Sequence, residues 1–341
     1  MNSLLLPLIS LTNWMGTTTA PPPPPSPEQI QEELNRAEVQ YEKAKSMFNP
    51  WYTGPLVTPS ATTVPPGVGF LQPYLFGVGT YGTFDANRHS VGLAHNTYSV
   101  KLTPILQFGL TETMDFELIP TGVVNWSHGS TGGGFSDLIA IAGWRIQSET
   151  LYVPVMKFTI GETFPTGKYK HLSTNGLGLN ATGEGSYQTQ FGFAIQKVIW
   201  WLYPHPLSPR FFIGYSIPTT VHVTGFNAYG GGFGTDGKVR PGNTLTTDLG
   251  LELSLTQSWV LALDIAYVAQ DATKFTGTLG TNANGTPAAV GGGYNDNLSL
   301  APAIEYNWNG NLGIVTGMQF SVYGRNSANF INGQFSVIYV W

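Results

Sequence analysis

The stretch from Gly69 to the last residue, Trp341, is divided into segments of about ten residues in which apolar and polar side chains alternate. A period of two places successive side chains on opposite faces of a β-strand. In residues 244–256, one face is almost entirely leucine and the other carries Thr, Asp, Gly, Glu and Ser. The apolar faces end in Trp or Tyr, and the polar faces hold small residues and single charges. This combination predicts strands with lipid outside and water inside.

The number and connection of these segments predict a closed barrel. There are twelve, and the links after even segments are mostly short, whereas those after odd segments are mostly long and rich in Gly, Asn and Thr. This asymmetry is typical of an outer-membrane barrel with both termini on the periplasmic side. We therefore predict an all-β fold, a 12-stranded antiparallel transmembrane β-barrel over residues 68–341, preceded by an N-terminal amphipathic helix. The expected strands are 69–81, 97–110, 115–126, 136–147, 151–163, 187–199, 210–223, 244–256, 259–270, 297–308, 312–325 and 329–341.

Composition excludes several classes of protein. Only 10% of residues are Asp, Glu, Lys or Arg, against about 25% in an average soluble domain. The absence of Cys excludes a disulfide framework and a thiolate metal site. The histidines have no metal-ligand spacing, so we expect neither a metal nor a cofactor. The basic residues form no run that would follow a nucleic-acid backbone, so nucleic acid is not an expected partner.

The first 67 residues differ from the barrel segments. The short apolar run within residues 1–20 predicts a signal peptide, although no basic residue precedes it, which favours a true start upstream; a disordered or interfacial tail is the alternative. A Pro-rich spacer follows at 21–25, and Ser26-Pro27 predicts the start of a helix over 27–48. Its apolar residues have heptad spacing, which fits either an oligomerising coiled coil or, as we favour, a helix packed on its own protein. Residues 50–67, rich in Pro, predict an extended linker.

The C-terminal strand ends in an apolar face that finishes with an aromatic residue. A soluble edge strand of this kind would expose a long apolar edge to other chains. The ending resembles the terminal signal by which barrel-assembly machinery recognises outer-membrane proteins, so this machinery is an expected partner. The residues of this signal are Phe335, Val337, Tyr339 and Trp341.

Three motifs in the middle of the chain resemble a known family. Residues 137–145 (DLIAIAGWR), 161–169 (GETFPTGKY) and 182–190 (TGEGSYQTQ), followed by 192–197, resemble the outer-membrane family named for the MetA pathway of phenol degradation. Residues 48–56 resemble the pre-barrel segment of channel-like outer-membrane proteins of intracellular Gram-negative bacteria. The resemblance implies an outer-membrane channel or transporter whose substrates are mostly unassigned, and it implies no catalytic residues.

The alternation of the strands predicts which charges face the lumen. Six acidic and four basic residues are expected there, which favours a porin or channel for small solutes with a slight cation preference. The alternative is that these charges pair across a narrow barrel and close it. The expected pore-lining residues are Lys101, Glu117, Asp137, Arg145, Lys157, Asp248, Glu252, Asp264, Glu305 and Arg325.

Three other functions remain open from the sequence. A transporter of aromatic compounds would use aromatic side chains turned into the lumen, and an adhesive surface barrel would use the long loops 224–243 and 271–296. An outer-membrane hydrolase would use His128 and Ser130, but the sequence offers no third catalytic group, so we do not expect an enzyme. The aromatic residues considered are Phe70, Tyr74, Phe76 and Phe212.

Overall fold

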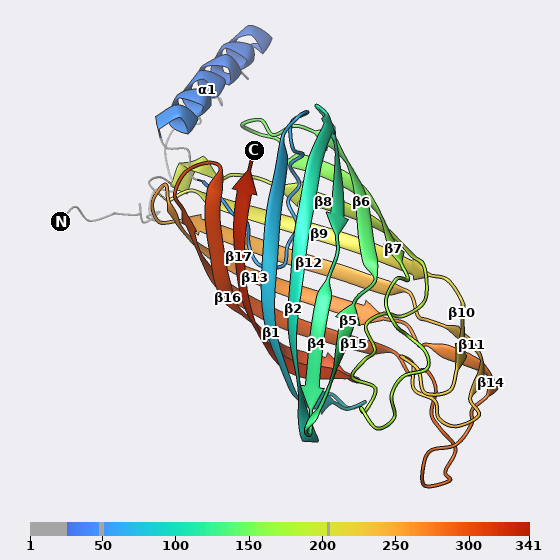
Figure 1. The fold of residues 1–341 in the computed structure, drawn as a ribbon. Coiled ribbons are helices and arrows are strands. Elements are labelled where there is room, and N and C mark those ends of the chain that lie inside the picture. The colour runs from blue at the N-terminus through green and yellow to red at the C-terminus, as the bar shows by residue number, and fades with distance from the viewer. Residues whose placement is uncertain (1–25, 48–50, 203–204) are drawn as a thin grey trace, which may run out of the picture.

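The computed structural model describes residues 26–47, 51–202 and 205–341, and it shows a closed antiparallel β-barrel of twelve strands (Figure 1). Two of the barrel strands are interrupted: β3 and β4 together form one, and β5 and β6 form the next. The predicted fold class is therefore confirmed. The barrel segments are β1 (Gly69–Phe84), β2 (Ser90–Thr111), β3 (Met114–Ile119), β4 (Gly122–Ser127), β5 (Ser130–Phe135), β6 (Leu138–Gln147), β7 (Val155–Phe164), β8 (Gln188–Gln196), β9 (Leu207–Pro218), β12 (Thr244–Ser254), β13 (Trp259–Gln270), β15 (Asn295–Asn307), β16 (Leu312–Arg325) and β17 (Ser327–Val340).

The barrel closes between its first and last strands. β1 pairs with β17 on one side and with β2 on the other. At the seam, the Gly69 amide donates to the Trp341 carbonyl at 3.1 Å, and the Trp341 amide donates to the Gly69 carbonyl at 3.0 Å. Closure leaves no free sheet edge along this seam, which is the general requirement for a sheet that lies in lipid.

The exposure of side chains follows the alternation predicted from the sequence. On β9, Phe211, Ile213 and Tyr215 point outward and are about 40% exposed. Arg210 and Phe212, which alternate with them along the strand, are buried. Exposed apolar side chains outside and buried polar side chains inside are the reverse of a soluble barrel, and they match a lipid-facing surface.

The two ends of the barrel differ. We call the end at which β1 begins and β17 finishes the terminal end, and the opposite end the loop end (Figure 1). The loop end carries a separate three-stranded sheet of β10 (Val221–Thr224), β11 (Asp236–Arg240) and β14 (Lys274–Thr278), held together by an apolar cluster. Residues 82–96, expected as a loop, instead mostly extend the β1–β2 hairpin, because Gly82 pairs with Gly92 and Phe84 with Ser90.

The helix α1 (Pro27–Met47) lies outside the barrel at the terminal end (Figure 1). Ser26 caps it: its hydroxyl accepts the Gln29 amide, and the Gln29 side chain accepts the Ser26 amide. Tyr41 is buried and packs edge-on against Trp200 of the short helix η1 (Trp200–Leu202), with ring centroids 6.3 Å apart. Burial raises the pKa of the Tyr41 phenol.

Two apolar residues in the first half of α1 are open. Ile30 and Leu34 are 44% and 39% exposed, so a homo-oligomer through this helix stays a prediction. No helix in the described ranges is long and apolar enough to cross a membrane. The expected signal peptide, the spacer at 21–25 and Phe48, the predicted end of the helix, lie outside the described residues.

Candidate functional site

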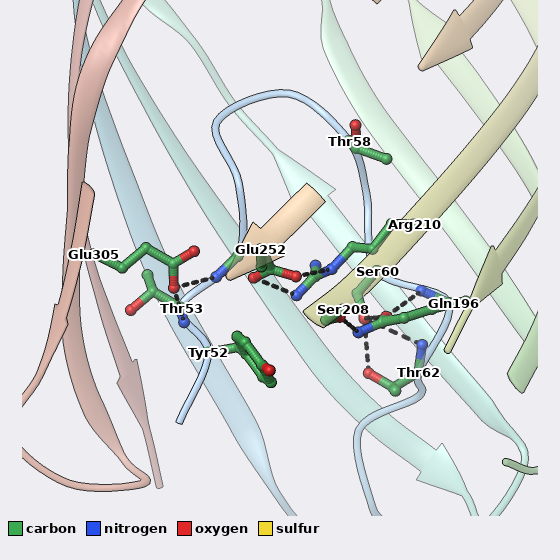
Figure 2. Close-up of polar contacts among 12 residues, drawn as sticks. Tyr52, Thr53, Thr58, Ser60, Thr62, Gln196, Ser208, Arg210, Glu252 and Glu305 are labelled. Atoms are coloured by element: carbon green, nitrogen blue, oxygen red, sulfur yellow. Dashed lines mark hydrogen bonds and ion pairs between the residues drawn. The ribbon is translucent and has the colours of Figure 1, made fainter. Parts of the chain in front are cut away.

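Residues 51–66, which connect the helix region to β1, lie inside the barrel, where the sequence led us to expect only an extended linker. We call them the lumen segment. Trp51 donates its amide to the Gln257 carbonyl at the terminal end, and the chain then runs into the lumen as a narrow loop (Figure 2). It returns to the same end, where Pro66 pairs with Gly109 just before β1 begins. The lumen is therefore occupied by the protein's own chain.

The first attachment of the lumen segment is the carboxylate of Glu305 on β15. Its Oε2 accepts the amides of Thr53 at 2.7 Å and of Gly54 at 3.2 Å. The Thr53 hydroxyl donates to Asn307 on the same strand at 2.8 Å. Glu305 is completely buried, so these donors take the place of water at its carboxyl group.

The second attachment is Asp264 on β13, which accepts four hydrogen bonds. Its Oδ2 accepts the amides of Leu56 at 2.9 Å and Val57 at 3.2 Å. Its Oδ1 accepts the Thr58 amide at 3.0 Å and the Thr58 hydroxyl at 2.6 Å. Hydrogen bonds to a charged group contribute about 1.5–3 kcal/mol each, so this single carboxylate is a strong fixing point for the tip of the segment.

Two glycines of the barrel, one on β12 and one on β16, allow the lumen segment to come this close to the strands. A Cβ at Gly313 would lie 2.3 Å from the Thr53 hydroxyl oxygen, and one at Gly250 would lie 2.9 Å from the Thr58 hydroxyl oxygen. Both distances are shorter than a carbon can tolerate, so these positions require glycine while the segment is in place. The wall and the segment are therefore shaped for each other.

The strands β12, β13 and β15 thus form what we call the holding wall. On it, Glu252 is fully buried and forms an ion pair with Arg210 of the neighbouring β9, with 2.6 Å between the Arg210 Nε and the Glu252 carboxylate (Figure 2). Arg210 also lies beside Gly54 of the lumen segment. This wall carries more carboxylates than cations, and backbone amides of the lumen segment supply donors to Asp264 and Glu305.

The opposite side of the lumen, formed by β1, β2, β3, β7 and β8, is the cavity wall. Here Lys157 lies 3.4 Å from Asp115 and 3.6 Å from Glu117, and it also donates to the Thr62 carbonyl at 3.3 Å. On β8, the Gln196 side-chain oxygen accepts the Ala61 amide at 3.3 Å. The returning half of the lumen segment therefore has fewer attachments to charged groups than the first half.

A cavity of about 750 Å³ lies beside the lumen segment; the cavity wall supplies much of its lining, and β9, β12 and β15–β17 supply further residues. Its lining is mixed, with aromatic, aliphatic, amide and charged side chains. The cavity is lined by all four aromatic residues that the sequence suggested for a transporter of aromatic compounds. Two of them, Tyr74 and Phe76, are stacked with ring centroids 5.6 Å apart. These four residues are Phe70, Tyr74, Phe76 and Phe212.

The structure brings six of the ten predicted pore-lining residues together. Three lie on the holding wall around the lumen segment, one lies on the holding wall beside the cavity, and two form the ion-pair cluster of the cavity wall. They are Glu252, Asp264, Glu305, Asp248, Glu117 and Lys157.

The other four predicted residues lie apart from this group. Lys101 is exposed and pairs in register with Phe76. Arg145 donates to the Glu112 carbonyl in the turn before β3, at 2.5 Å. Arg325 ends β16 after a β-bulge, which shifts the alternation, and pairs in register with Asp296.

Asp137, the fourth of these residues, lies at the interruption between β5 and β6. Its carboxylate accepts the amides of Gly167 and Glu184, each at 2.8 Å. It therefore fixes the loop that follows β7 and contributes to the order of the loop end.

The sequence analysis missed Asp115, Arg210 and the lumen segment. Asp115 shares the strand face of Glu117, and Arg210 shares that of Phe212, so strict alternation would have found both. The position of the lumen segment has no comparable signal, because the partners of its first half lie more than 200 residues away in the sequence.

The remaining candidates have ordinary surroundings. His128 stacks on His95, and the Ser130 hydroxyl is directed at the Asn175 carbonyl, at 3.5 Å. At the C-terminus, Phe335, Tyr339 and Trp341 are about half exposed on the outer face, as an assembly signal requires, but recognition by the assembly machinery stays a prediction.

The sequence matches no family model and no curated protein. The fold is similar to that of the COG4313 outer membrane channel from Pseudomonas putida F1, with a TM-score of 0.65 and 13% identity over 84% of this chain and 100% of that chain. The translocator domain of autotransporter NalP from Neisseria meningitidis matches with a TM-score of 0.41 and 13% identity, over 91% of this chain and 97% of that chain. A mutant of the TodX monoaromatic hydrocarbon channel matches with a TM-score of 0.35 and 11% identity, over 81% and 90%.

The similarity to the first of these structures confirms the predicted resemblance to outer-membrane channels at the level of the fold. This chain has the fold of an outer-membrane β-barrel.

Proposed function

We propose that this protein is an outer-membrane channel for small apolar and aromatic molecules, kept closed by its own lumen segment. The observation that carries the proposal is the combination of a lumen occupied by residues 51–66 with a cavity beside them that four aromatic side chains line. An open porin needs a continuous water path, whereas here the first half of the segment is fixed to two buried carboxylates.

The cavity supports the choice of substrate class. Ligand sites for small molecules are typically about 300–1,000 Å³ and mostly apolar with a few polar groups. The cavity of about 750 Å³, with its four aromatic side chains and a small set of charges, has these properties. A molecule bound there would contact the lumen segment, so its passage requires the segment to move.

The test is single-channel conductance of the purified protein in a planar bilayer, with and without residues 21–67. We expect the full-length chain to be closed most of the time and the shortened chain to show steady conductance steps. Folding of both forms is checked by heat-modifiable mobility on gels. Equal, continuous conductance of the two forms would contradict the proposal.

A second candidate is a passive pore for small polar solutes, which the ion-paired charges of the cavity wall favour. Liposome swelling with a small sugar separates the two candidates: a polar pore admits the sugar once the segment is removed, and an apolar channel excludes it. We also propose that the terminal end faces the periplasm, because the long loops of outer-membrane barrels face outward.

A further inference from the structure

The cavity contains one charged side chain without a partner of opposite charge. Among the described residues, five charged side chains line it, and four of these are in ion pairs. The pairs are Lys157 with Glu117 at 3.6 Å, Glu149 with Lys197 at 3.1 Å, and Arg210 with Glu252 at 2.6 Å. The fifth charged residue is Asp248 of β12.

Asp248 is buried in the wall of the cavity. It is 4% exposed, and its Oδ1 has no hydrogen-bond partner in the described part of the chain. In the barrel wall it lies opposite Phe212 of β9 and Ala266 of β13. Leaving a carboxylate buried in this way is costly unless a cation or a proton accompanies it.

The charged neighbours of Asp248 do not satisfy it. Asp264 on β13 has the same sign, and its oxygens already accept donors from the lumen segment. Arg210 on β9 is directed at Glu252. The carboxylate is therefore available to a ligand that enters the cavity.

The surroundings indicate which kind of cation fits. No group of three His, Cys, Asp or Glu side chains in the described ranges is arranged to hold a metal ion. The cavity instead supplies aromatic side chains, among them Phe212 and Tyr74. Aromatic faces attract organic ammonium groups, and a nearby carboxylate completes a site for them.

We propose that the cavity binds small arylalkyl ammonium compounds, with Asp248 accepting the charged nitrogen and the aromatic lining receiving the ring. The inference rests on the proposed function, because it specifies which apolar molecules the channel admits. The proposed substrates carry a positive charge in addition to an aromatic ring, and Asp248 is the residue that recognises this charge.

The test compares two probes that differ in one group, 2-phenylethylamine and 2-phenylethanol, by calorimetric titration of the detergent-solubilised full-length protein at neutral pH. We expect the amine to bind about tenfold more tightly than the alcohol. Asp248→Asn removes that preference and leaves the affinity for the alcohol unchanged. The matched control is Glu117→Gln, which removes a cavity carboxylate but leaves Lys157 paired with Asp115; it keeps the preference for the amine.

The outcomes separate this inference from the proposed function. Equal affinity for the two probes, or an amine affinity that Asp248→Asn does not change, overturns the ammonium site and leaves the apolar channel standing. Binding of neither probe, in protein shown to be folded by its gel mobility, counts against the proposed function as well.

Discussion

The two walls of the lumen are built from similar strands but have different roles. On the holding wall, Asp264 and Glu305 receive backbone amides of the lumen segment, and in the described part of the chain neither is in an ion pair. On the cavity wall, Lys157 lies between Asp115 and Glu117, so the charges satisfy one another within the barrel. The comparison indicates that Asp264 and Glu305, which are in no described ion pair, hold the lumen segment through its amides, whereas the paired charges of the cavity wall leave room for a cavity.

Breaking the holding wall should have the largest effect. The double substitution Asp264→Asn and Glu305→Gln removes both charged acceptors of the lumen segment. We expect the open fraction of single channels in planar bilayers to rise about tenfold or more, because each charged hydrogen bond contributes about 1.5–3 kcal/mol and about 1.4 kcal/mol corresponds to tenfold. Glu117→Gln, on the cavity wall, is the control and should leave the open fraction unchanged; a rise of equal size there would remove the distinction between the walls.

Breaking the cavity wall should destabilise the barrel itself. Lys157→Met leaves Asp115 and Glu117 without their cation, and loss of one partner of a buried pair costs about 3–5 kcal/mol. The free energy of unfolding, measured by urea titration in detergent, should fall by this amount. Adding Asp115→Asn should restore part of the loss. No change in stability would show that the cluster is solvated rather than buried.

A smaller effect is expected from crowding the contact between wall and segment. In Gly313→Ala, the new Cβ would lie 2.3 Å from the hydroxyl oxygen of Thr53, so the segment must shift. Overpacking of this kind costs about 1–3 kcal/mol, and conductance steps should become more frequent. Gly77→Ala is the matched control, since nothing lies within 4 Å of its new Cβ. Identical recordings from the two variants would mean that the segment does not control conduction.

The smallest effect concerns the aromatic lining. Phe212→Ala should lower the uptake of phenol-like solutes into proteoliposomes a few-fold, because an aromatic contact contributes about 0.5–1.5 kcal/mol. Phe211→Ala changes the adjacent residue, which is 41% exposed on the outer face, and should have no effect on uptake. A loss of uptake in both variants would indicate general damage to β9.

The sequence predicted the barrel well because strand alternation is a local property. The twelve strands, the short turns and the start of α1 depend on neighbouring residues and agree with the structure, whereas the long connection expected at 82–96 is mostly strand. The bulge in β16 is also local, but no residue type in the sequence marks it. Counting alternate residues along the strand therefore does not reveal that the alternation is shifted before Arg325.

The candidate site was only partly predictable. Strand alternation identified Asp264 and Glu305 as inward-facing carboxylates. Their role in holding residues 51–66 depends on contacts between segments more than 200 positions apart in the sequence. No periodicity encodes such a contact. The signals present, prolines and threonines in an uncharged stretch, indicate an extended chain without indicating where it lies.

The central claim, that residues 51–66 close the channel while they are attached to the holding wall, is tested most directly by fixing them there. The chain has no cysteine, so Thr58→Cys with Gly250→Cys introduces a single pair. The first change removes the Thr58 hydroxyl that a Cβ at Gly250 would meet, and the segment has to move outward only from a Cβ–Cβ distance of 3.0 Å to the roughly 3.5–4.5 Å of a disulfide. We would record single-channel conductance before and after reduction of this pair. The account predicts silence while the disulfide is intact and conductance steps after reduction. Equal conductance in the two states, with the disulfide confirmed by mass spectrometry, would contradict it.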